Sequence, residues 1–159
     1  MPAPNPRPPG PLRPSDWRIG IWRQFLLAHA SLMRTLEEEL QETCSMPLAW
    51  YDVLLQLVEA PEYRLRMAEL ADRLLMSRSG LTRMVDRLQA EGWVRREPSA
   101  DDARGMYAVL TRPGFEALRR AAPVHLAGIR DHFLIHFSDD ELRQLGTLMD
   151  RAVDDAQGG

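Results

Sequence analysis

The chain has 159 residues, of which 45% are hydrophobic and 27% are charged. This length and balance are typical of one globular domain, and no apolar run reaches the ~20 residues that a membrane-spanning helix needs. The net charge of −3 argues at first against nucleic acid, but residues 64–112 hold ten arginines against seven acidic residues. The N-terminus lacks the apolar centre of a signal peptide, and the single cysteine, Cys44, excludes an intrachain disulfide. We therefore expect a cytoplasmic protein with a locally basic surface.

Residues 1–15 contain seven prolines, which lack a backbone N–H and disfavour helix at the preceding residue. We predict a disordered or polyproline-like arm. It carries only two arginines, so a solvated tail is favoured over an arm that contacts DNA or another subunit.

A long helix is predicted from a cap at Ser15 or Asp16 to about Thr43. Its apolar seam recurs at alternating spacings of four and three residues and comprises Trp22, Leu26, His29, Met33, Leu36 and Leu40. A helix of ~26 residues is ~39 Å long, which is too long to be buried in one small domain. Part of it should therefore pack against another subunit.

A second helix is predicted between Pro47 and Pro61, because proline suits the first turn of a helix and ends a helix that reaches it. Its apolar stripe comprises Leu48, Tyr51, Leu54, Leu55 and Val58. Residues 64–66 then suit a short strand, which we expect to join a small sheet.

Two short helical patterns follow, over residues 67–75 and residues 78–91. Ser77 suits the N-cap of the second helix, and Gly92 suits the left-handed position that ends it. The buried stripes are Met67, Leu70, Ala71 and Leu74 in the first helix and Leu81, Met84, Val85 and Leu88 in the second.

The other face of the second helix is polar and comprises Arg78, Ser79, Thr82, Arg83, Asp86 and Gln89. These side chains can hydrogen bond to base edges and phosphates, and arginine can bind guanine through two hydrogen bonds. Two helices joined by a tight turn, with a polar face on the second, are typical of the helix-turn-helix. With the basic local charge, this pattern favours DNA binding over a merely solvated helix.

A β-hairpin, or wing, is predicted over residues 93–110, with a polar tip at residues 98–104. Arg104 is placed to enter a minor groove, whose negative potential attracts a guanidinium group. Asp102 is the candidate wing-orienting residue, because its carboxylate can hold Arg96 or Arg104 in a fixed pose.

Beyond the wing, Thr111 suits the cap of another helix, with Pro113 in its first turn and its end near Phe137. Residues 138–141 read as a capping box that begins a last helix. The two stripes comprise Phe115, Leu118, Ala122, Leu126, Ile129 and Phe133, then Leu142, Leu145, Met149 and Ala152. Together with the first helix, these two helices would supply a dimerisation layer.

The run SGLTRMVDRLQAEGWVRR, followed by DDARGMYAVLT, resembles the core of the MarR (multiple antibiotic resistance regulator) family. The Thr-Arg-x-Val-Asp-Arg-Leu run, the Gly-x-Val-x-Arg run, the wing Asp-x-Arg and the closing Leu-Thr stand at that family's spacing. The resemblance covers roughly residues 16–155, and Trp93 stands where a leucine is common. It implies a mainly α winged helix-turn-helix fold with a small β-wing and long terminal dimerisation helices. It also implies a homodimeric regulator, usually a repressor, that binds pseudo-palindromic double-stranded DNA and often releases it on binding a small aromatic or phenolic ligand.

In this interpretation, residues 16–159 form a single domain after the arm at residues 1–15. Residues 47–111 form the winged helix-turn-helix, and residues 16–46 and 112–157 form the dimerisation helices. The expected DNA-binding residues are Ser77, Arg78, Ser79, Thr82 and Arg83, with Arg87 and Arg95 at phosphates and Arg104 in the minor groove.

A ligand pocket would lie where the dimerisation helices meet the DNA-reading part. Its candidate lining residues are Trp17, Trp22, His29, Trp50 and Tyr51. Arg18 or Arg23 could face an anionic group there. The alternative is that the tryptophans serve packing alone.

Three other interpretations stay open. His132 and His136 are spaced as two metal ligands on one helix face would be, and Cys44 or His125 could be further donors. No clear third ligand completes such a site, so no metal or cofactor is predicted. Cys44 could sense oxidation if its thiol were exposed. The third interpretation is a winged helix-turn-helix protein that binds other proteins instead of DNA. No Gly-rich phosphate loop, Gly-x-Ser-x-Gly run or plausible carboxylate pair is present, so we expect no enzyme.

Overall fold

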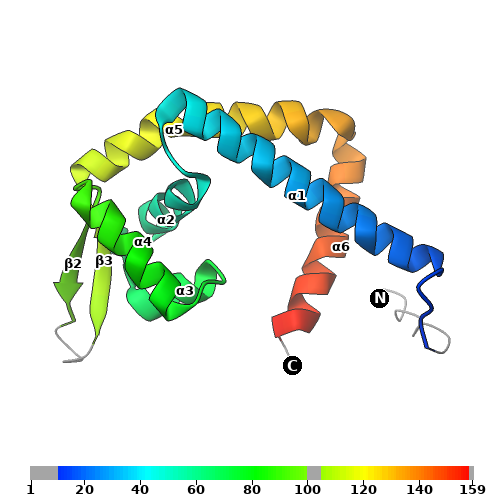
Figure 1. The fold of residues 1–159 in the computed structure, drawn as a ribbon, viewed down its shortest axis with the longest axis horizontal. Helices are drawn as coiled ribbons and strands as arrows, with labels where there is room; N and C mark the ends of the chain where they lie inside the picture. The colour runs from blue at the N-terminus through cyan, green and yellow to red at the C-terminus, as the bar shows by residue number, and fades with distance from the viewer. Residues whose placement is uncertain (1–10, 100–104, 158–159) are drawn as a thin grey trace. The chain divides into compact units, whose positions relative to one another are not determined.

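The structure, a computed structural model, describes residues 11–99 and 105–157. The chain divides into two compact units, residues 1–34 and residues 35–159. The described part is mainly α with one small antiparallel sheet, as predicted (Figure 1). Its elements are α1 (Trp17–Cys44), α2 (Leu48–Glu59), η1 (Pro61–Tyr63), β1 (Arg64–Arg66), α3 (Met67–Arg73), α4 (Arg78–Ala90), β2 (Val94–Pro98), β3 (Met106–Leu110), α5 (Arg112–His132), η2 (Leu134–His136) and α6 (Asp139–Gln157).

Helix α1 begins at the cap predicted for Asp16. The Oδ1 atom of Asp16 accepts from the backbone N–H of Arg18 at 3.0 Å, and its Oδ2 atom accepts from the Arg18 guanidinium at 2.6 Å. These bonds, the side-chain one first, hold the pKa of Asp16 at about 2. Neither α1 nor any other helix in the described ranges is apolar over a long enough stretch to span a bilayer.

The sheet has three strands in the order β1-β3-β2, with both pairs antiparallel. The prediction that residues 64–66 add a strand to the hairpin is therefore confirmed. Ala108 in the central strand β3 pairs with Leu65 on one side and with Arg96 on the other. Leu65, Ala108 and Val94 are buried, so this face of the sheet covers the core.

The core of the second unit lies between α2, α3, α4, the start of α5 and the sheet. Leu70, Leu81, Val85 and Leu88 are fully buried, which confirms most of the predicted stripes of α3 and α4. The predicted stripe of α2 is partly wrong. Val53 and Leu57 are fully buried, whereas Leu55 and Val58 are only half-buried. The reason is that α2 packs against both α5 and the sheet. Its buried face is therefore wider than the predicted stripe and is rotated about the helix axis relative to it.

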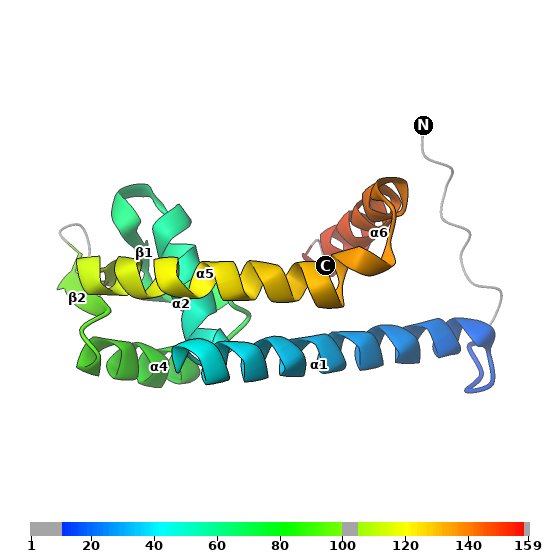
Figure 2. The ribbon, with the colours of Figure 1, turned by 90° about the horizontal axis from the view of Figure 1, so that it is seen from above.

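Helix α5 ends earlier than predicted. The helix ends at His132, and Phe133 leaves helical geometry with φ −127° and ψ −63°. The rings of Phe133 and Phe137 then lie 5.3 Å apart, so the apolar residues beyond α5 pack on each other across η2. The predicted capping box is confirmed, because the backbone N–H of Ser138 donates to Glu141 at 2.8 Å. The wing lies beside the start of α5, and α6 leaves its other end (Figure 2).

Candidate nucleic-acid interface

The turn between α3 and α4 is tight because one residue adopts a left-handed conformation. Helix α3 ends at Arg73, two residues earlier than predicted, and Leu75 follows with φ +52° and 92% of its surface exposed. Ser77 caps α4 as predicted: its Oγ atom accepts from the backbone N–H of Gly80 at 3.1 Å. The geometry is that of a helix-turn-helix.

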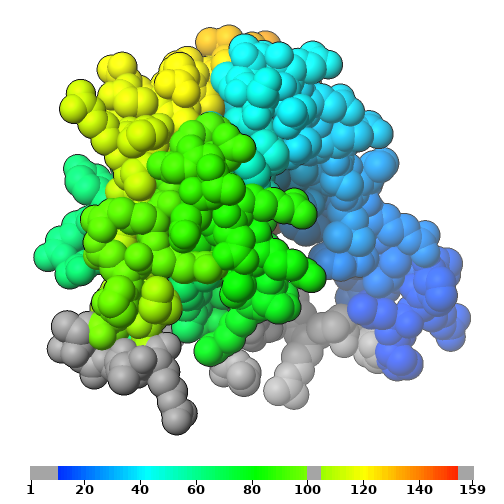
Figure 3. All heavy atoms as spheres, turned by 60° about the vertical axis from the view of Figure 1, so that its left-hand side comes forward, coloured from blue at the N-terminus to red at the C-terminus, as the bar shows by residue number. Residues whose placement is uncertain are grey.

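Helix α4 separates an apolar face from a polar face. Leu81, Val85 and Leu88 are buried. The exposed polar side chains on α4 and its cap are Ser77, Arg78, Ser79, Thr82, Arg83, Asp86, Arg87 and Gln89. In Figure 3 the green segment that contains α4 stands uncovered at the front of the molecule. Six of the eight expected DNA-binding residues therefore share one exposed surface, which we call the reading face.

A second group of arginines lies on the strands of the sheet. Arg95 is exposed on β2 and forms an ion pair with Glu97. Arg66 on β1 donates to the Ser99 hydroxyl at 3.2 Å, and its guanidinium lies 5.3 Å from the ring centre of Tyr107. Asp102 and Arg104, expected to orient the wing and to enter the minor groove, lie outside the described residues.

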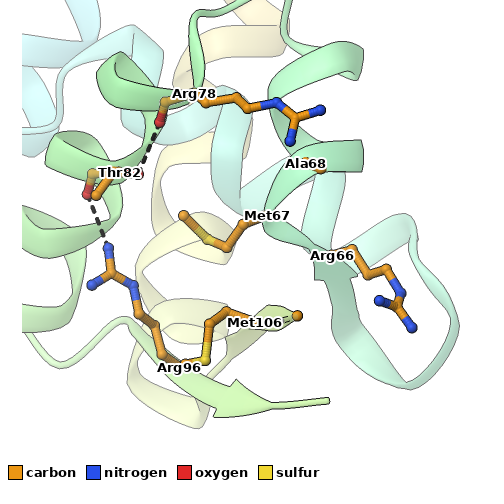
Figure 4. Close-up of a pocket in the computed structure, with 8 residues that line it drawn as sticks. Arg66, Met67, Ala68, Arg78, Thr82, Arg96 and Met106 are labelled. Carbon is orange, nitrogen blue, oxygen red and sulfur yellow. Dashed lines mark hydrogen bonds between the residues drawn. The ribbon is translucent and has the colours of Figure 1, made fainter. Parts of the chain in front are cut away.

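A groove of about 580 Å³ separates the reading face from the wing. Its lining combines three arginines with apolar side chains: Arg66, Met67, Ala68, Arg78, Thr82, Arg96, Gly105 and Met106. Figure 4 shows the guanidinium of Arg96 crossing from the wing towards α4. Neither Arg66 nor Arg96 is among the residues expected at this surface from the sequence. The alternation of β2 could have indicated Arg96, because it shares a face with buried Val94.

The five candidate ligand-pocket residues are divided between the two units. Trp17, Trp22 and His29 are exposed on α1 in the first unit, where the Trp22 ring stacks on Phe25 and the Phe25 ring stacks on His29. Trp50 and Tyr51 lie on α2 in the second unit.

In the second unit, the two α2 aromatics each contact another ring. The ring of Trp50 meets Trp93 edge-on, with centres 5.5 Å apart. Tyr51 is 3% exposed and lies 4.4 Å from the ring of His125, and burial raises its pKa.

The predicted histidine pair does not share a helix. His132 is the last residue of α5, and its Nε2 atom lies 2.6 Å from Glu39, whereas His136 lies in η2. The expectation that both residues face one side of one helix is therefore wrong, because the chain turns at Phe133. Among the described residues, no group of three histidine, cysteine or acidic side chains could hold a metal ion. Cys44 is half-buried at the end of α1.

An exposed polar helix, a tight turn before it and an antiparallel wing after it define a winged helix-turn-helix DNA-binding protein. The sequence model of the MarR family matches residues 45–105. The structure of Sco3205, a MarR family transcriptional regulator from Streptomyces coelicolor solved in complex with DNA, is 36% identical, with a TM-score of 0.85 and 91% of each chain covered. AbsC, another MarR family regulator from Streptomyces coelicolor, is 31% identical, with a TM-score of 0.87, 94% of this chain covered and 100% of AbsC.

A third relative, the HTH-type transcriptional regulator PecS of Dickeya dadantii, is 34% identical over 89 residues. That match covers 56% of this chain and 53% of PecS, so the chain spans about half the length of that relative. The chain belongs to the MarR family. It is a DNA-binding transcriptional regulator, and the family it belongs to consists of regulators and not of enzymes.

Proposed function

We propose that this protein is a ligand-responsive repressor that binds a pseudo-palindromic operator as a homodimer. The observation that carries the proposal is the reading face: α4 buries its apolar side and leaves a row of hydroxyl and guanidinium groups exposed beside the wing. Sco3205, which is similar over most of the chain, was solved in complex with DNA, and this supports DNA binding by the present chain. The proposed location is the cytoplasm, where the operator is accessible.

In the proposed complex, α4 lies in the major groove. Arg78 and Arg83 contact bases or adjacent phosphates, together with the hydroxyl groups of Ser77, Ser79 and Thr82. Arg87 and Arg95 contact phosphates, and Arg104 enters the minor groove with Asp102 orienting the wing.

The homodimer is supported by apolar side chains that remain exposed. On α1 and α6 they comprise Trp17, Ile21, Trp22, Phe25, Leu26, Leu27, Leu148, Met149 and Val153. Residues 16–46 and 112–157 are the proposed dimerisation helices around the DNA-reading residues 47–111. A two-fold axis would set the half-sites one helical turn apart, ~10 bp.

A regulating ligand must bind the DNA-incompetent arrangement of the dimer more tightly than the competent one. We propose a small aromatic or phenolic molecule, for which the exposed aromatic side chains Trp17, Trp22 and His29 and the α2 aromatics Trp50 and Tyr51 are the candidates. An oxidant acting at Cys44 is the alternative input.

Arg83→Ala tests the reading face. We expect it to weaken binding to a selected operator duplex by roughly tenfold or more, the effect of losing a base or phosphate contact, without changing the melting temperature or the dimer. Arg130→Ala is the matched control, because it removes the same charge from an exposed position near the far end of α5. Unaltered affinity of Arg83→Ala would remove this residue from the interface. Gel shifts at several salt concentrations separate the alternatives: counterion release predicts steep weakening, whereas a protein-binding module would show little affinity for any duplex.

A further inference from the structure

Arg96 links the wing to the DNA-reading helix. It lies on the core-facing side of β2, paired with the buried Ala108, and its side chain is 25% exposed. One guanidinium nitrogen lies 2.7 Å from the Oδ1 atom of Asp86, and another donates to the backbone carbonyl of Thr82 at 3.0 Å. Thr82 and Asp86 are four residues apart on α4, so a single side chain of the wing contacts the helix at two points. Figure 4 shows the first of these contacts, the bond to the Thr82 carbonyl.

The guanidinium group of Arg96 restrains the geometry of this contact. A guanidinium group is planar and presents its donors in a rigid fork, so two bonds from it restrain both distance and direction. The pair contributes little to folding stability, because 54% of the Asp86 side chain is exposed and solvent screens the interaction. What the two contacts provide is a direct connection between β2 and α4.

Asp86 places a negative charge on the reading face. A carboxylate on the reading face repels phosphates, so its removal should strengthen DNA binding if charge alone mattered. Its partner in the structure is Arg96, whose charge it neutralises beside the groove that Arg66 and Arg78 also line.

We infer that Arg96 is a positioning residue for DNA binding and that Asp86 serves as its anchor. The pair holds α4 and the wing at the angle at which one duplex can engage both. This inference rests on the proposed contact of the reading face with DNA. It predicts that breaking the link reduces binding to the correct sequence more than binding to any other duplex, because only specific binding needs both elements in register.

Asp86→Asn tests the inference by the sign of its effect. The probes are a duplex selected from a random library by the wild-type protein and a duplex of the same composition in shuffled order. We expect Asp86→Asn to bind the selected duplex about fivefold more weakly, and the shuffled duplex no more weakly than wild type. Glu91→Gln is the matched control, since it removes one negative charge from the exposed end of α4 and should leave affinity unchanged or slightly higher.

Two further variants separate positioning from direct contact. Asp86→Glu keeps the anchor charge and should restore most of the affinity. Combining Asp86→Asn with Arg96→Gln should weaken binding no more than Arg96→Gln alone, because the two changes break one link. Melting temperatures verify that each variant folds.

The outcomes distinguish the inference from the function on which it rests. If the wild-type protein selects no duplex, the proposed function fails and the inference fails with it. If the wild-type protein selects a duplex and Asp86→Asn binds it as tightly as Glu91→Gln does, the function stands and the positioning role is refuted. Additive losses in the double variant would also refute the role.

Discussion

Gly114, in the first turn of α5, lies against the backbone of Trp93 with no room for a side chain. A Cβ atom at this position would overlap the carbonyl oxygen of Trp93, and it would lie 2.9 Å from the carbonyl carbon and 3.0 Å from Cδ1 of Leu110. The carbonyl oxygen cannot move away freely, because it accepts from the backbone N–H of Thr111 at 3.1 Å. Replacement of Gly114 by alanine must therefore displace either α5 or the start of β2.

The cost follows from two opposing effects. Overpacking usually lowers the free energy of unfolding by about 1–3 kcal/mol. We expect the steric cost of Gly114→Ala to be about 3 kcal/mol, because the new Cβ atom meets hydrogen-bonded backbone that cannot easily move. Alanine is better than glycine in a helix by at most about 1 kcal/mol. The net loss is about 2 kcal/mol, which for a chain of this length lowers the melting temperature by about 4–8 °C.

Thermal and urea unfolding of the two alanine variants at Gly114 and Gly146 measure this effect. Gly146 lies within α6, where nothing stands within 4 Å of an added Cβ atom. Gly146→Ala should therefore stabilise the protein by about 0.5–1 kcal/mol. If Gly114→Ala proved as stable as Gly146→Ala, the close approach between α5 and Trp93 would be refuted.

Two further predictions concern His125 and the N-terminal arm. The Nδ1 atom of His125 is buried without a hydrogen-bond partner among the described residues, and burial lowers the pKa of this ring below 6.5. The unfolded chain then binds the proton at a higher pH than the folded chain, so stability falls as the pH drops through about 6.5 and levels off below the folded pKa. His125→Leu should flatten this part of the curve, measured as urea midpoints between pH 5 and pH 8, and an unchanged slope would exclude His125 as its source. Deletion of residues 1–15 retains the Asp16 cap of α1 and should leave the proposed dimer intact in light scattering; a monomeric product would assign the arm a structural role.

The reading face could be predicted from the sequence because its signals are local. The cap at Ser77, the stripe of Leu81, Val85 and Leu88, and the left-handed Gly92 at φ +74° depend on residues within one or two turns. Strand alternation likewise placed the hairpin, and the structure pairs its strands as expected.

Other features depend on packing between distant segments, which spacing alone does not indicate. The two-point contact of Arg96 with α4 joins residues 10 and 14 positions away, across a sheet-to-helix contact that no local pattern specifies. The end of α5 was misjudged because Phe133 and Phe137 keep helical spacing, whereas in the folded chain their rings meet across a turn. The wrong end of α5 and the unpredicted contact of Arg96 both depend on tertiary contacts that outweigh the local pattern.

The contacts around Thr111 indicate how a movement of α5 would reach the DNA-reading helix. The Thr111 hydroxyl donates to the carbonyl of Gly92 at 2.7 Å, directly after α4, and accepts from the backbone N–H of Gly114 at 3.1 Å. One side chain thus joins the end of α4, the start of β2 and the first turn of α5. Because Gly114 packs closely on Trp93, α5 has little room to shift relative to the segment between α4 and β2. A rotation of α5 must therefore turn α4 and the wing as one body, provided that the Arg96 link holds. In the proposed mechanism, a ligand that moves the dimerisation helices changes the spacing of the two reading faces and need not distort either of them.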